Sequence, residues 1–193
     1  MNDLLNWLLE IDSDLFLFLN GKYLPWIDPV MIFFSAYYSW FIICILIIIF
    51  LIYRKGKAGV WAALFGALCV GLNAGINNII KIIITRPRPI HQETLDGLFR
   101  TLEKYESSYS FFSAHSSNAF CIAVFTSLFI RSRWYTVMIF LWATIVAYSR
   151  IYVGKHYPLD VFCGILFGIL TGYIGYQVFL HFSNKKLSPS RKS

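Results

Sequence analysis

Residues 31–53 read Met-Ile-Phe-Phe-Ser-Ala-Tyr-Tyr-Ser-Trp-Phe-Ile-Ile-Cys-Ile-Leu-Ile-Ile-Ile-Phe-Leu-Ile-Tyr and contain no charged side chain. At a helical rise of about 1.5 Å per residue, this run is long enough to cross the roughly 30 Å hydrocarbon core of a bilayer. Similar apolar runs occupy about 58–80, 114–130, 134–149 and 160–182, and the shorter ones must extend into flanking polar residues to span. The sequence therefore predicts an all-α integral membrane protein, a bundle of about five transmembrane helices.

The overall composition supports this fold class and limits the functions that remain. The chain has 193 residues, of which 58% are hydrophobic and only 14% charged, too apolar for an ordinary soluble domain. A net charge of +7 could indicate nucleic-acid binding, but the basic residues are scattered and form no nucleic-acid motif. The four cysteines lie inside apolar runs without metal-site spacing, which favours buried thiols over metal ligands.

The two ends of the chain differ from its middle. Residues 1–20 carry leucines at helical spacing that acidic residues interrupt, so we predict an amphipathic helix in the membrane interface rather than a sixth span. The start has no basic segment, and we expect no cleaved signal peptide. Residues 184–193 are polar and basic, which predicts a disordered tail. We expect one membrane-embedded domain over 1–193.

The distribution of charge predicts the orientation in the membrane. If the N-terminus lies outside, the cytoplasmic segments are 54–57, 131–133 and 183–193. These segments hold nine of the 17 Lys and Arg residues and none of the ten Asp and Glu residues. Cytoplasmic loops are enriched in basic residues, so the C-terminus is predicted to be cytoplasmic. The segments 81–113 and 150–160 then share the outer face.

Three cations stand where apolar runs stop on that outer face, namely Lys81, Arg88 and Arg150. A charge this close to hydrocarbon costs roughly 2.5–3.5 kcal/mol unless it is paired. Pro87 and Pro89 constrain the chain around Arg88, whose guanidinium can hold two phosphate oxygens. A basic cluster that only stops membrane transfer belongs on the cytoplasmic side, so we expect an anion site here.

His156 and Asp160 lie four residues apart near the start of the last apolar run. On one helix face, Asp160 can hold one imidazole nitrogen while the other is presented outward, as a nucleophilic or basic histidine requires. The alternative is an interfacial pair that only stabilises the helix start. The same spacing continues through Gly164, Gly168 and Gly172, a ridge that allows close helix packing.

Ser113-Ala114-His115 opens the third apolar run. Ser113 is a good N-cap, and the free N–H groups of a first helical turn favour an anion. An ordinary helix cap is the alternative. Asn73 and Asn77 share the helix face of Lys81 and can support the site or bond to neighbouring helices.

Other polar side chains of the predicted outer face give weaker signals. Arg86 and His91 are candidates for substrate contact, with a solvated loop position as the default. The acidic residues of the long loop form no metal-site array, and no metal site or cofactor is predicted. These residues are Glu93, Asp96, Glu103 and Glu106.

These groups together resemble the three-part signature of the type 2 phosphatidic acid phosphatase superfamily, over about residues 58–182. The matching parts are Lys81, six residues, Arg88-Pro89; then Ser113-Ala114-His115; then Ser149-Arg150, five residues, His156, three residues, Asp160. The middle part departs from the usual Pro-Ser-Gly-His, because Phe112 and Ala114 replace proline and glycine. Ala114 adds a Cβ where glycine permits close backbone approach.

The resemblance implies a metal-independent hydrolase without cofactors that acts on a phosphomonoester or diphosphate of a membrane lipid. His156 would be the nucleophile oriented by Asp160, and His115 the general acid and base. The phosphate would be held by Lys81, Arg88, Ser113, Ala114 and Arg150. The chain looks like small bacterial members, including undecaprenyl diphosphate and lipid A phosphatases, which implies the bacterial inner membrane with the site facing the periplasm or exterior.

Two other functions are compatible with these residues. The phosphoryl group could pass to a second lipid or sugar, or the site could bind or transport a phospholipid without catalysis. The complete set of His115, His156 and Asp160 argues against the second. No obligate protein partner is inferred.

Overall fold

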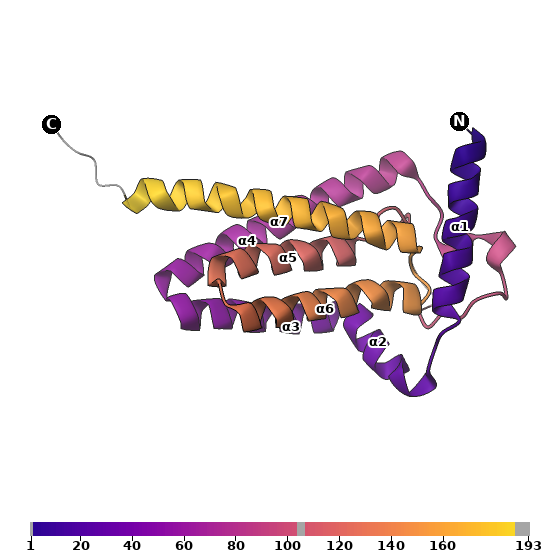
Figure 1. Cartoon of the computed structure of the whole chain (residues 1–193), viewed down its shortest axis with the longest axis horizontal. Coiled ribbons are helices and arrows are strands. Elements are labelled where there is room, and N and C mark those ends of the chain that lie inside the picture. Colours follow the sequence, from indigo (N-terminus) through magenta and orange to yellow (C-terminus); the bar gives the residue numbers. More distant parts are fainter. Residues whose placement is uncertain (1, 104–106, 188–193) are drawn as a thin grey trace.

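The computed structural model describes residues 2–103 and 107–187, and this part of the chain is built from helices. The α-helices are α1 (Asn2–Asn20), α2 (Asp28–Ser35), α3 (Tyr37–Lys55), α4 (Lys57–Ile84), α5 (Ala114–Ile130), α6 (Arg133–Tyr152) and α7 (Pro158–Leu187). Short 3-10 turns occupy Pro25–Ile27, Pro89–His91 and Glu93–Leu95. Helices α3 to α7 run along the long axis as a bundle, and α1 lies across one end of it (Figure 1).

The lengths of these helices confirm the predicted class of fold. Among the described residues, four helices are long and apolar enough to cross a membrane, namely α3, α4, α6 and α7. Helix α5 is apolar and has 17 residues. It packs against α4, α6 and α7, so most of its side chains are buried. The protein is therefore an all-α bundle of the membrane-spanning kind.

The run that predicts the first span is not one continuous helix. The backbone is extended at Ala36, with φ −79° and ψ 146°, so the spanning helix α3 begins only at Tyr37. The Ser39 hydroxyl donates to the carbonyl oxygens of Ala36, at 2.8 Å, and Phe33. A serine hydroxyl can satisfy the carbonyls that such a break exposes, and hydropathy does not report this. The prediction of a single helix over 31–53 is wrong.

Helix α1 turns a partly polar face toward the bundle. Asp12, Phe16 and Asn20, spaced four residues apart, are at most 5% exposed. The leucines that predict the amphipathic helix, such as Leu4 and Leu8, are exposed. A bilayer interface accommodates such leucines. Helix α1 therefore packs on the bundle through a mixed face in which polar Asp12 and Asn20 flank the apolar Phe16.

The glycine ridge of α7 packs against the backbone of α5. A Cβ added at Gly164, Gly168 or Gly172 would lie 2.7, 2.2 or 2.6 Å from a carbonyl oxygen of α5 or its N-cap. Only residues without a side chain allow this approach, as the small-residue spacing predicts. Helix α5, which carries His115, and helix α7, which carries Asp160, are thereby held in a fixed register.

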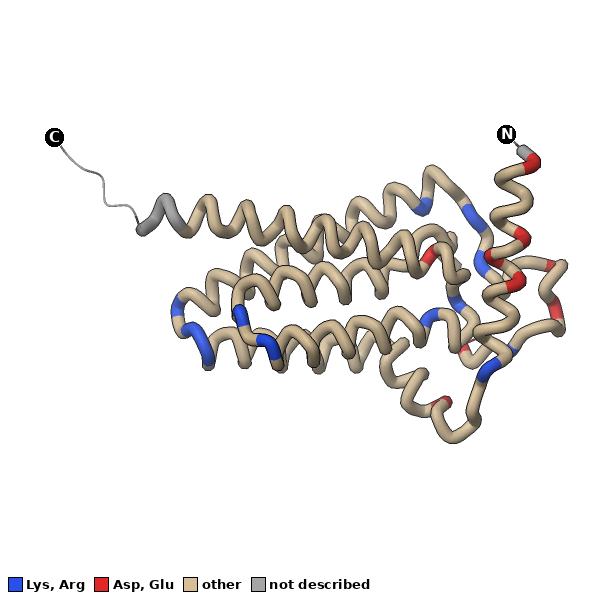
Figure 2. Tube along the Cα trace, in the orientation of Figure 1, with Lys and Arg blue, Asp and Glu red and all other residues tan. Residues whose placement is uncertain are grey.

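Charge is distributed unequally between the two ends of the bundle (Figure 2). One end, which includes Lys57, shows only Lys and Arg, whereas the described Asp and Glu residues lie at the other end, around α1. Helix α7 continues to Leu187, and the remainder of the predicted tail, 188–193, lies outside the described residues.

Candidate active site

The predicted site residues gather at the end of the bundle that α1 covers. This end brings together the segment after α4, the start of α5 and the turn between α6 and α7 (Figure 1). Ala114 and His115, at the start of α5, are half-buried. The other predicted site residues are at most 5% exposed: Lys81, Arg88, Ser113, Arg150, His156 and Asp160.

His156 lies in the turn that joins α6 to α7. Its backbone N–H and that of Lys155 donate to the Arg150 carbonyl, at 3.2 and 3.0 Å. The imidazole Nδ1 is 3.6 Å from a carboxylate oxygen of Asp160, and Nε2 is 3.1 Å from a guanidinium nitrogen of Arg88. Arginine can only donate, so Nε2 is the acceptor and Nδ1 carries the proton in this arrangement. Nδ1 therefore lies on the side of Asp160, and Nε2 lies on the side of Arg88.

Burial and neighbouring cations keep the His156 imidazole neutral. Burial is the main cause that holds its pKa well below the usual value, and the charges of Arg88, Lys81, Arg150 and Lys155 lower the pKa further. A neutral imidazole keeps the lone pair that a nucleophile or base needs. His156 is therefore in the reactive protonation state near neutral pH.

Asp160 is fully buried and has more partners than His156 alone. One carboxylate oxygen accepts from Arg86, at 2.7 Å. The other accepts from the Ser110 hydroxyl and from the Tyr157 backbone N–H, at 3.1 Å. Ser110 Oγ also lies 3.4 Å from Nδ1 of His156. These donors satisfy a buried carboxylate and fix its direction.

The three predicted cations contact neutral oxygen atoms. Lys81 donates to the Tyr109 carbonyl at 2.8 Å, and Arg150 donates to the Ser35 carbonyl at 2.8 Å and to the Ser35 hydroxyl. Arg88 donates to the carbonyl and hydroxyl of Ser108, at 2.7 and 2.8 Å. The break between α2 and α3 thus supplies an anchor for Arg150. These contacts fix the direction of each cationic side chain.

The start of α5 is joined to the start of α7. Ser113 caps α5, because its hydroxyl accepts from the Ser116 N–H at 3.4 Å, and its own N–H donates to the Asp160 carbonyl at 3.0 Å. The His115 ring packs against Tyr37 with ring centroids 4.9 Å apart. The predicted N-cap is thus present, and α3 supports the ring of His115.

Two of the weaker predictions are resolved by the contacts. Asn73 bonds to Ser117, Asn118 and Thr171, so it links helices rather than facing the site. Asn77 donates to the carbonyl of Phe112 at 3.0 Å, which steadies the segment before Ser113. His91 is exposed, as expected for a solvated loop.

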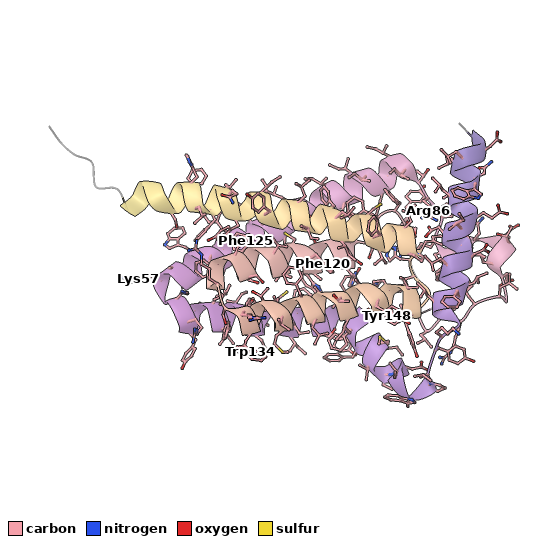
Figure 3. All side chains as sticks on the ribbon, viewed as in Figure 1. Lys57, Arg86, Phe120, Phe125, Trp134 and Tyr148 are labelled. Atoms are coloured by element: carbon pink, nitrogen blue, oxygen red, sulfur yellow. The ribbon has the colours of Figure 1, made fainter. Side chains whose placement is uncertain are left out.

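Arg86 is the main residue that the sequence places incorrectly. Its side chain is 12% exposed, and its guanidinium bonds to Asp12 and Asp160, both at 2.7 Å. The guanidinium also stacks over the Tyr157 ring, 4.0 Å from its centroid. Figure 3 shows Arg86 between α1 and the start of α7. The default of a solvated loop position is therefore wrong.

Ser110 and Asp12 also contact the site, and the sequence gives little sign of either. Ser110 stands alone in an irregular segment with no periodicity to place it. Asp12 lies four residues after Leu8, in the same helical series as the leucines, so its spacing does not distinguish it from them.

Comparison with known proteins agrees with this geometry. A family model described as the PAP2 superfamily matches residues 60–183. A lipid A 4'-phosphatase of Porphyromonas gingivalis is 33% identical over 192 residues, which cover 96% of this chain and 80% of the relative. An undecaprenyl-diphosphatase of Sulfolobus acidocaldarius is 29% identical, with 88% of this chain and 79% of the relative covered.

Two solved structures have the same arrangement of helices. The transmembrane PAP2-type phosphatidylglycerolphosphate phosphatase of Bacillus subtilis has a TM-score of 0.73 at 24% identity, covering 96% of this chain and 90% of that one. Aquifex aeolicus LpxE has a TM-score of 0.63 at 26% identity, covering 86% of this chain and 94% of that one. Because the family model covers most of the chain and a relative above 30% identity aligns along nearly all of it, the chain belongs to the PAP2 superfamily.

Proposed function

We propose that this enzyme, a membrane lipid phosphatase, removes a terminal phosphate from its lipid through a phosphohistidine at His156. The observation that carries the proposal is the buried, neutral His156, which has Asp160 on its Nδ1 side and the Arg88 cation on its Nε2 side. A neutral imidazole with one nitrogen held by a carboxylate is oriented for nucleophilic attack through the other.

In the first step, Nε2 of His156 attacks phosphorus while the bond from phosphorus to the leaving oxygen breaks. His115 gives a proton to that oxygen, which departs as the hydroxyl of the lipid or as a lipid monophosphate. In the second step, water attacks the phosphohistidine and His115 takes the proton of the water. The nitrogen–phosphorus bond breaks, inorganic phosphate leaves and both histidines return to their starting states.

The cations would stabilise the charge that develops on the phosphoryl oxygens. We assign Lys81, Arg88 and Arg150 to this role, together with Ser113 and the N–H groups near Ala114 at the start of α5. Arg88 contacts Nε2 of His156 in the absence of substrate. An incoming phosphate would therefore take the position between Arg88 and His156, where it meets both a cation and the nucleophile.

The most suitable substrates are lipids of the lipid A or undecaprenyl diphosphate type. Relatives named for each of these activities align along most of the chain. Both classes place a phosphate at the membrane surface, where the buried cations of this site lie. We place the site on the periplasmic or outer face of the bacterial inner membrane, because basic residues alone occupy the opposite end of the bundle.

The test is phosphate release from a panel of these lipids by purified wild-type protein and by His156→Ala. We expect the variant to lose more than about 1,000-fold in kcat, since removal of a nucleophile costs orders of magnitude. His181→Ala is the matched control, because His181 is exposed on α7 outside the site. It should keep full activity. More than about a tenth of wild-type activity in folded His156→Ala would refute the nucleophile assignment.

Two further measurements separate hydrolysis from its alternatives. A chelator should leave the rate unchanged, because the assigned groups supply all the charge stabilisation. Acid-labile label on His156 after brief mixing with labelled substrate would identify the phosphohistidine. Labelled product on an added lipid or sugar acceptor, instead of free phosphate, would assign phosphotransfer.

A further inference from the structure

Asp12 of α1 is linked to the proposed nucleophile through Arg86 and Asp160. We propose that Asp12 and Arg86 are positioning residues that set how much negative charge Asp160 presents to His156. This inference rests on the proposed role of His156, but it assigns a function in the reaction to a helix outside the family signature.

The link is built from short contacts between buried groups. Arg86 donates through one terminal nitrogen to Asp160 and through the other to Asp12, both at 2.7 Å. Asp12 is 5% exposed and Asp160 fully buried. The second oxygen of Asp12 accepts from the Leu159 backbone N–H at 2.8 Å, beside Asp160 in the first turn of α7. Every polar atom of the Asp12 carboxylate is thus directed at the site.

Arg86 remains a cation in this position. Burial lowers its pKa, but the Asp160 and Asp12 carboxylates outweigh burial and raise it overall. Burial is the largest effect and raises the pKa of Asp12 overall, although the hydrogen bonds from Arg86 and from the Leu159 N–H oppose that rise. The contacts of Arg86 join the three groups into one acid–guanidinium–acid set, in which two acidic side chains share one cation.

This set faces a site rich in basic groups, in which Lys155 is ion-paired with Glu103. The groups that face His156 from the surrounding elements are Lys81 of α4, Arg88 of the following segment, Arg150 of α6, Lys155 of the connecting turn, His115 of α5, Ser110 before α5 and Asp160 of α7. Attack on phosphorus places positive charge on the imidazole. Asp160 can balance this positive charge only if Arg86 does not fully neutralise the Asp160 carboxylate. Because Arg86 is shared with Asp12, part of the negative charge of Asp160 remains for the imidazole.

A purely structural role for Asp12 makes different predictions. Asp12 also docks α1 against α7, and loss of docking would lower stability without a directed effect on the titration of His156. A change in the negative charge of Asp160, in contrast, shifts the pKa of His156 in a defined direction. Removing the Asp12 charge must lower the His156 pKa, because imidazolium loses a favourable neighbour, whereas removing the Arg86 charge must raise it.

The experiment measures kcat/KM against pH for Asp12→Asn and Arg86→Gln in detergent. The acid limb reports protonation of the free enzyme and substrate, and the substrate phosphate contributes equally in every variant. We expect the limb to move to lower pH by about half a unit or more for Asp12→Asn and to higher pH for Arg86→Gln, as buried charges at this range imply. Asp12→Asn should lower kcat about tenfold and change KM less than twofold, since no substrate contact is lost.

Two matched controls come from the same helix. Asp14→Asn makes the same chemical change at an exposed position and should leave the rate and pH profile unchanged. Asn20 holds α1 through the carbonyls of Arg100, Ile151 and Tyr152, at 3.0 to 3.1 Å. Asn20→Ala should reduce thermal stability without moving the acid limb, because it changes no charge. If Asp12→Asn cannot be obtained in folded form, Arg86→Gln still tests the direction in which the acid limb moves.

The proposal is overturned if folded Asp12→Asn and Arg86→Gln leave the acid limb in place or move it in the same direction. To separate this outcome from failure of the proposed function, the His156 imidazole is titrated directly by NMR, with its signal identified by loss in His156→Gln. Opposite shifts of that titration without any phosphatase activity would support the charge linkage and reject the reaction. Unchanged titration in an active enzyme would reject the linkage alone.

Discussion

Replacement of Gly168 by alanine should damage both stability and catalysis through one contact. The added Cβ would lie 2.2 Å from the Ser117 carbonyl oxygen, 3.0 Å from its carbon and 3.1 Å from the Cys121 backbone nitrogen. All three are backbone atoms of α5, so no side-chain rotation can relieve the clash. The oxygen contact is about 1 Å closer than van der Waals distance, and the two helices must separate by a similar amount.

The magnitude follows from this displacement. Overpacking of a close interface costs about 1–3 kcal/mol, or roughly 2–12 °C in melting temperature for a chain of this size. Helix α5 carries Ser113 and His115, while α7 carries Asp160, so separation moves the two halves of the site apart. A misplacement of about 1 Å can cost about 100-fold in rate.

The assay is thermal unfolding in detergent together with phosphate release per folded molecule. Gly71→Ala is the control, because a Cβ at this position of α4 meets no atom within 4 Å. It should behave as wild type in both measurements. If Gly168→Ala melted within 1 °C of Gly71→Ala and kept its rate, the inferred contact between α5 and α7 would be refuted.

Three other outcomes are expected. Ser110→Ala removes a donor to the buried Asp160 carboxylate and should lower kcat about tenfold with a small change in KM, measured by steady-state phosphate release. In a cysteine-free background, an impermeant thiol reagent added outside should label a cysteine at position Gly97 and spare one at Gly56, and the reverse pattern would invert the orientation. Glu103→Gln should destabilise the fold at pH 7 and progressively less below about pH 4.5. Burial raises the pKa of Glu103, but its lysine partner lowers it overall, so the stability it contributes is present above the unfolded value and is lost as pH falls through the folded value.

The parts of the fold and site that depend on local spacing are predictable from the sequence. The glycines of α7 share one face because helical periodicity alone determines this relation. His156 lies in the turn before α7, and its short interval to Asp160 keeps the two residues close in the chain. Ser113 is predictable as a cap because serine is a preferred residue directly before an apolar helical run. The family signature also indicates which helix ends lie close together in the fold.

The parts that depend on distant pairing are not predictable in this way. Arg86 meets Asp12 across 74 residues, and no local pattern in either segment indicates the other. The break at Ala36 escapes a hydropathy profile, since a serine hydroxyl that bonds to nearby carbonyls permits a bend inside an apolar run. Acidic residues on an amphipathic helix also suggest solvent, although Asp12 turns toward a buried arginine.

The length of α5 has a consequence for the membrane itself. With 17 residues it is about 25 Å long, less than a typical hydrocarbon thickness of about 30 Å. Arg131 and Arg133 follow directly, and basic residues at this place would hold the far end of α5 at the water boundary. The shortfall in length would then fall at the end that starts with Ala114, and a phosphate bound there, as we propose, would lie below the level of the surrounding lipid headgroups. Bilayer thickness would then set the work of drawing a lipid into the site, and thinner bilayers would lower it.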